Sequence, residues 1–132
     1  MSNTAKLILK NSLANIINYL PSTNNGPYVL AFHGVTDGTN PVLNNKLHIQ
    51  QEKFYEIIKY LNKNYDIANI NELINKNYSF KKNKIYLTFD DGYKNNLINV
   101  APILKELSLP WTMFVSTYHI NEQIKIPTFY IN

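Results

Sequence analysis

Two adjacent aspartates, Asp90 and Asp91, are the residues of this chain best suited to chemistry. They directly follow residues 85–89 (IYLTF), an apolar run whose length and composition predict a buried strand. In parallel α/β sheets, catalytic groups collect at the carboxyl ends of the strands. Neighbouring side chains leaving a strand point in different directions, so one carboxylate can bind a cation while the other accepts a proton. Gly92 then allows a sharp backbone turn and keeps a side chain out of the pocket.

The triplet Asp90-Asp91-Gly92 is also typical of a simple turn or a helix cap, because Asp and Gly both favour turns. Two like charges side by side repel each other, however, and a single Asp would have been enough for a turn. The pair therefore favours a functional site, and the turn remains the alternative at this point.

Alternating apolar runs and amphipathic segments predict an α/β domain with mostly parallel strands. We expect strands at residues 28–32, 65–68, 85–89 and 111–117, and helices at 50–64, at 69–74 and from about Pro102 to about Leu107. Asn69 and Glu72 form a plausible capping pair for the second of these helices. An amphipathic helix at residues 9–20 and a polar linker come first, which divides the chain into residues 1–27 and a domain at 28–132.

Size and composition narrow the class of protein. A chain of 132 residues corresponds to one domain, but a closed α/β barrel typically takes about 200 residues or more. The net charge of +4 comes from scattered Lys without any Arg, which argues against nucleic-acid binding. The absence of Cys excludes disulfides and thiolate metal sites.

The segment from Leu7 to Leu20 is interrupted by polar residues, so it predicts neither a signal peptide nor a membrane span. We therefore expect a cytoplasmic protein if the N-terminus is authentic, and an extracytoplasmic or cell-surface protein otherwise.

Residues 88–93 (TFDDGY) resemble the first motif of the polysaccharide deacetylases, the NodB-homology or carbohydrate esterase family 4 group. Residues 30–35 (LAFHGV) are similar to the first strand of that family, which ends in a His-x-Val element. Residues 101–107 and 110–115 resemble the helix and the strand that follow the acidic motif. The resemblance extends from about residue 29 to residue 120.

This resemblance implies a metal-dependent hydrolase that removes acetyl groups from an N-acetylated polysaccharide or glycan intermediate. It also implies a distorted (β/α) barrel, of which this chain would be the incomplete N-terminal portion. In the family, the first Asp is the general base and the second is a metal ligand, which assigns these roles to Asp90 and Asp91. A divalent metal ion, Zn²⁺ being the expected one, would lower the pKa of its water to about 7. Asp90 would accept the proton of that water.

The family's second motif, His-Ser/Thr-x-x-x-His, is missing from the sequence, as are its later motifs. Since a catalytic zinc usually needs three protein ligands, we expect a truncated chain that is inactive alone and binds metal weakly or not at all. His33 is expected to line the pocket with Gly92 and Tyr93. His48 is expected to be solvated in front of a surface helix, and His119 to approach the site without a pairing partner.

Two other functions remain as alternatives. The chain could be a non-catalytic glycan-binding or partner-binding remnant of the same fold. A phosphoryl-transfer or receiver-type domain is disfavoured, because no further Asp follows Asp91. Tyr78, Phe80, Tyr93 and Trp111 could stack on sugar rings, although a core position is the commoner role for such aromatics and is favoured for Trp111. An incomplete sheet would also leave an open edge, which predicts self-association.

Overall fold

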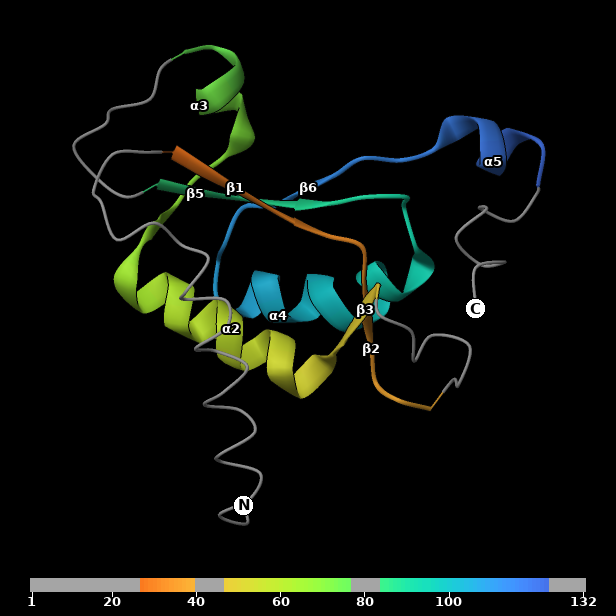
Figure 1. The fold of residues 1–132 in the computed structure, drawn as a ribbon, viewed down its shortest axis with the longest axis horizontal. Coiled ribbons are helices and arrows are strands. Elements are labelled where there is room, and N and C mark those ends of the chain that lie inside the picture. The colour runs from red at the N-terminus through yellow and green to blue at the C-terminus, as the bar shows by residue number, and fades with distance from the viewer. Residues whose placement is uncertain (1–26, 40–46, 77–83, 124–132) are drawn as a thin grey trace.

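The computed structural model describes residues 27–39, 47–76 and 84–123, and its centre is a four-stranded parallel sheet (Figure 1). The central strand is β5 (Lys84–Phe89), and β1 (Pro27–Phe32) pairs with its whole length. Two short strands share the other side of β5: β4 (Asp66–Ile67) at its beginning and β6 (Thr112–Met113) at its end. The structure thus confirms an α/β fold with mostly parallel strands and no closed barrel.

The two helices α2 (Gln51–Asn64) and α4 (Ala101–Glu106) cover one face of this sheet (Figure 1). Between sheet and helices lies a core of fully buried apolar side chains: Val35, Phe54, Ile57, Ile58, Leu61, Ile85, Leu87, Phe89, Val100 and Leu104. In α2 these residues recur at helical spacing, and in β5 they alternate, as the two periodicities require. Burial of these side chains of α2 and β5 holds the helices against the sheet.

Phe89 is the aromatic centre of the core. Its ring lies 5.3 Å from Phe32, 5.9 Å from Phe54 and 5.4 Å from Trp111, measured between centroids. Trp111 meets Phe89 edge-on at an interplanar angle of 87° and is packed against the core, as predicted. The last residue of β5 is therefore held firmly, directly before the acidic loop begins.

A second, two-stranded parallel sheet was not foreseen from the sequence. It consists of β2 (Gly34–Thr36) and β3 (His48–Gln50), and β3 leads directly into α2. The runs are only three residues long and contain polar side chains, so no apolar periodicity marks them. Their pairing fixes the turn that follows β1.

The helix α3 (Ile70–Ile74) begins as predicted, with Asn69 accepting a hydrogen bond from the backbone N–H of Asn71 at 3.0 Å. Glu72, the second residue of the expected capping pair, makes a different contact. The carboxylate of Glu72 accepts a hydrogen bond from Lys84 at the start of β5. An ion pair across the fold has thus taken the place of a local cap.

The third helix begins earlier than predicted. Helical backbone starts at Lys94, continues through the π-helical turn η2 (Asn96–Val100) and then becomes α4, with Pro102 in the first turn of α4. The sequence predicts a start at Pro102 because proline fits only a first turn. Because the π-helical turn η2 ends at Val100, Pro102 can occupy the first turn of α4 inside a longer helical segment.

The predicted strand at residues 111–117 is much shorter than expected. Only Thr112 and Met113 pair with β5. The backbone N–H of Phe114 donates to the carbonyl of Phe89 at 2.8 Å, and Phe89 is the last residue of β5, so the pairing ends there. The chain then forms α5 (Thr117–Asn121). The predicted helix at residues 9–20 and the aromatic residues Tyr78 and Phe80 lie outside the described residues. Among the described helices, none is long and apolar enough to cross a bilayer.

Candidate active site

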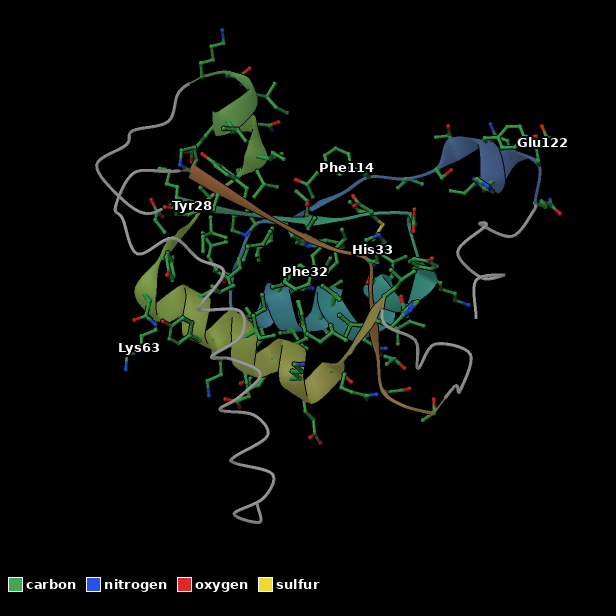
Figure 2. All side chains as sticks on the ribbon, in the orientation of Figure 1. Tyr28, Phe32, His33, Lys63, Phe114 and Glu122 are labelled. Atoms are coloured by element: carbon green, nitrogen blue, oxygen red, sulfur yellow. The ribbon has the colours of Figure 1, made fainter. Side chains whose placement is uncertain are left out.

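The acidic loop lies at the carboxyl end of the central strand, beside His33. The backbone N–H of Asp90 donates to the carbonyl of Phe32 at 2.8 Å, which extends the β1–β5 ladder beyond the strands. His33 and Asp90 are therefore neighbours across the two strands, and Figure 2 shows His33 where β1 ends and the chain turns into β2. Asp90, Asp91 and His33 are all half-buried. The structure thus brings the predicted acidic pair and His33 to the same edge of the sheet.

The backbone of the loop is in an uncommon conformation. Asp91 has a φ of 70° and Gly92 a φ of 72°, both in the left-handed region. A Cβ atom on Gly92 would come 3.0 Å from Cγ1 of Val115, so glycine is required there for space as well as for φ. For a residue with a side chain such as Asp91, this conformation costs about 1–2 kcal/mol. Lys76, Ser108 and Gln123 also have a positive φ, so this conformation does not by itself mark a functional site.

Two buried asparagines, Asn96 and Asn99, hold the turn after β1 and were missed in the sequence. The side-chain amide of Asn96 donates to the carbonyl of His33 at 2.7 Å, and that of Asn99 donates to the carbonyl of Val35 at 2.8 Å. Asn96 is completely buried and Asn99 is 8 % exposed. The available signal was their occurrence inside a helical segment, where asparagine competes with the backbone for hydrogen bonds. They tie the helix after the acidic loop to the segment that carries His33.

His48 is not the solvated residue that its position before a helix predicted. Its ring is half-buried and packs edge-on against Tyr93, with 5.0 Å between ring centroids. Burial, and next to it the charge of His33, lowers the pKa of His48 below its ordinary value of 6.5. Tyr93 itself is only 5 % exposed, so its ring belongs to the interior and offers no face to a sugar. The prediction failed because β3, which carries His48 inward, was not foreseen.

His119 makes a local side-chain contact that the sequence did not predict. It lies in α5, where its Nδ1 atom is 2.6 Å from the hydroxyl oxygen of Ser116. The ring of Tyr118 meets the His119 ring edge-on at 5.6 Å. These local contacts account for His119 without a role in the acidic site.

Comparison with known proteins now adds to this geometry. Residues 77–128, which contain the acidic loop, match the family model of the polysaccharide deacetylases. Residues 77–128 are therefore similar to part of a polysaccharide deacetylase domain. No curated protein matches the sequence significantly.

Two solved structures share part of the fold of this chain. A de-N-acetylase from Aggregatibacter actinomycetemcomitans is 24 % identical, with a TM-score of 0.55, over 66 % of this chain and 36 % of its own length. IcaB from Ammonifex degensii is 22 % identical, with a TM-score of 0.56, over 69 % of this chain and 38 % of its own length. The chain thus spans somewhat more than a third of these structures, and at this level of identity the likeness concerns the fold.

The described residues do not by themselves provide a complete site for a catalytic metal. Among residues 27–39, 47–76 and 84–123, no group of three or more His, Asp or Glu side chains lies close enough together to hold a metal ion. Since a catalytic zinc usually has three protein ligands, the Asp90–Asp91 pair and His33 amount at most to a part of such a site.

Proposed function

We propose that this chain contributes the acidic loop of a deacetylase that hydrolyses N-acetyl groups on a polysaccharide or a glycan intermediate. The observation that carries the proposal is the adjacency of Asp90 and His33 at the carboxyl ends of two parallel strands. The match of residues 77–128 to the deacetylase family supports it.

Asp90 and His33 have complementary capacities for proton transfer. In amide hydrolysis, water forms a new C–O bond to the acetyl carbonyl carbon, and the C–N bond to the sugar then breaks. Asp90, as a carboxylate, would accept the proton that the attacking water loses. His33, in its protonated form, would donate a proton to the departing amine nitrogen, so that acetate and the free amino sugar leave. A base and an acid in these roles typically each contribute about 10²–10⁴-fold to the rate.

Asp91 is proposed as one ligand of a divalent metal ion, with Zn²⁺ as the expected metal. A loop carboxylate at a strand end is a usual ligand for such a cation. The remaining ligands would lie outside the described residues. Because the described residues do not complete this site, no step of the reaction is assigned to the metal.

A second candidate function is a non-catalytic glycan-binding protein of the same fold. The observation that favours it is the same absence, within the described part of the chain, of any three-ligand metal cluster. Such a protein would bind an N-acetylated glycan without releasing acetate. The two functions therefore differ in a single measurable product.

The test measures zinc binding and acetate release by the chain and by three single variants. Zinc binding is followed by isothermal titration calorimetry, and acetate release is measured on N-acetylglucosamine oligomers with and without zinc. We expect Asp91→Asn to lose zinc binding by about tenfold or more, because it removes a charged ligand. Asp90→Asn should keep zinc binding but lose any zinc-dependent acetate release.

Glu106→Gln is the matched control, because it removes a carboxylate from an exposed position at the end of α4. It should behave as the unchanged chain in both assays. Equal zinc affinity of the unchanged chain and Asp91→Asn would contradict the ligand role of Asp91. Glycan binding without acetate release, under conditions in which zinc binds, would favour the non-catalytic function.

A further inference from the structure

The two peptide groups that flank His33 both accept hydrogen bonds from the segment that begins with the acidic loop. The carbonyl of Phe32 accepts from the backbone N–H of Asp90 at 2.8 Å. The carbonyl of His33 itself accepts from the side-chain amide of Asn96 at 2.7 Å. Both donors belong to one continuous segment, residues 90–96, so a single piece of chain holds His33 from both sides.

Fixing these two peptide groups also fixes the direction of the His33 side chain. Peptide groups are planar, so the backbone of a residue can rotate only at its own φ and ψ. The bond to Phe32 holds the peptide plane before the Cα atom of His33, and the bond from Asn96 holds the plane after it. The direction in which the Cα–Cβ bond of His33 leaves the backbone is therefore set by the acidic segment.

The burial of Asn96 indicates that this bond is more than a contribution to packing. Asn96 is completely buried, and its Oδ1 atom has no hydrogen-bond partner among the described residues. A carbonyl can only accept, so the atom that faces His33 must be the Nδ2 donor. Burying a polar atom without a partner lowers stability, and an apolar side chain of the same shape would avoid that cost. The donated bond to His33 is thus the gain that Asn96 brings to this position.

Asn99 makes a similar bond in a different setting, which provides a comparison within the chain. Its side-chain amide donates to the carbonyl of Val35 at 2.8 Å. Val35 is already held by the pairing of β2 with β3, where it lies opposite Ile49. His33 lies between β1 and β2 and belongs to neither strand. The conformation of His33 therefore depends on the bond from Asn96 more than that of Val35 depends on Asn99.

We propose that Asn96 is a positioning residue, which holds the side chain of His33 beside Asp90. This inference rests on the proposed function, in which Asp90 accepts the proton of water and His33 donates one to the departing amine. Groups that transfer protons must lie within hydrogen-bond distance of their partners. A side chain outside the regular strands keeps such a position only when further hydrogen bonds support it. Asn96 supplies this support from the interior, without contact to a substrate.

The test compares Asn96→Leu with Asn99→Leu in the whole chain, because leucine keeps the branched shape of asparagine and removes the donor. Backbone order is measured by NMR relaxation, and hydrogen exchange at individual amides is measured in the same samples. In the unchanged chain we expect an order parameter of about 0.85 at His33, as for rigid backbone. Asn96→Leu should lower this value below about 0.6 and speed exchange at the Asp90 amide about tenfold relative to Leu87 in β5. Asn99→Leu should leave both quantities unchanged.

A purely structural role of Asn96 predicts a different result. Exchange at Asp90 and Leu87 would then rise together, and both variants would have the same order parameter at His33. Either outcome would overturn the proposal. An order parameter below about 0.6 at His33 in the unchanged chain would also overturn it, and this measurement does not require Asn96→Leu to fold. None of these measurements involves acetate release, so a failure of the proposed deacetylase function would be distinguishable from a failure of the positioning role.

Discussion

The two ends of the central strand β5 carry acidic side chains in opposite circumstances. At the amino end, Lys84 lies between two carboxylates, with Nζ 2.5 Å from Glu72 and 3.4 Å from Asp66. At the carboxyl end, Asp90 and Asp91 are half-buried, and within the described part of the chain neither makes an ion pair. The strand β5 thus connects carboxylates that a lysine neutralises to a pair of carboxylates that, in the described part of the chain, have no ion-pair partner.

This difference distinguishes carboxylates that stabilise the fold from carboxylates that are available to a ligand. A carboxylate that serves only the fold is stabilised when a cation neutralises it, as Lys84 does for Glu72 and Asp66. A pair of neighbouring carboxylates without a cation lowers the stability of the folded chain, and proteins retain such pairs where a ligand supplies the missing charge. The comparison therefore assigns the amino end to the fold and supports the site that we propose at the carboxyl end.

The largest effect is expected from adding a third negative charge at the carboxyl end. Asn96→Asp replaces a completely buried amide, which donates to the His33 carbonyl, by a carboxylate that cannot donate. Burial of an unpaired charge should lower the free energy of unfolding by about 3 kcal/mol or more, measured by urea denaturation at pH 7. Asn62→Asp, at an exposed position of α2, should change it by less than about 0.5 kcal/mol. Similar values for both variants would contradict the importance of the buried bond.

Removing the cation from the amino end should have an intermediate effect. In Lys84→Met the carboxylates of Glu72 and Asp66 would repel each other without compensation. They remain 39 % and 40 % exposed, so solvent screens part of this repulsion, and we expect a loss of about 1 kcal/mol at pH 7. Lys105→Met, at an exposed position of α4, is the control. A loss as small as that of the control would show that the cluster does not support the fold.

The same cluster predicts a pH dependence. The hydrogen bond to Glu72, followed by the charge of Asp66, raises the pKa of Lys84 above its ordinary value of 10.5, against the opposing effect of burial. Lys84 is then protonated in the folded chain at pH values where the unfolded chain has begun to lose the proton. Its contribution is complete below pH 10.5 and is lost as the pH rises through the pKa of the folded state. The stability difference between the unchanged chain and Lys84→Met should therefore shrink above pH 10.5, measured by urea denaturation.

We expect the folded chain to become more stable when Asp91, at the carboxyl end of β5, is replaced by glycine. Asp91→Gly relieves a φ of 70° and one of two neighbouring charges, which should raise the free energy of unfolding by about 1 kcal/mol. Lys76→Gly, at a φ of 56° after α3, relieves backbone strain alone and is the matched control. A larger gain for Asp91→Gly than for Lys76→Gly would measure the repulsion between the carboxylates. A loss of stability in Asp91→Gly would show that Asp91 supports the fold.

The smallest effect concerns the edge of the sheet. Among the described strands, β1 pairs only with β5, and Val29 on β1 is 49 % exposed. We expect the chain to self-associate through this edge, and Val29→Lys to weaken the association, measured by light scattering over a range of concentrations. Leu97→Lys, at another exposed apolar position, is the control. A monomer at all concentrations would contradict the prediction.

The elements with long apolar patterns were predictable from the sequence. The strand before the acidic loop and the helix with Phe54 and Leu61 in its buried stripe were found because burial imposes their periodicities. The acidic loop was found because two adjacent aspartates are unusual after a buried strand. Its roles in catalysis and metal binding stay predictions.

The elements that were missed depend on contacts between distant residues. The pairing of β2 with β3 and the bonds from Asn96 and Asn99 to the segment after β1 join residues that carry no local signal. The position of His48 followed from that pairing and was therefore wrong in the sequence-based prediction. Tertiary contacts, rather than local propensity, determine the structure of the segment after β1 and the position of His48.

The sheet order also limits how the chain can be made. In the described part of the chain, β1, β4 and β6 all pair with β5 and not with one another. During synthesis from the N-terminus, β1 and β4 must therefore wait without their sheet partner until Phe89 has left the ribosome. Pairing across so long a stretch of chain is slow, so we expect β1 and β4 to complete their sheet contacts late in folding.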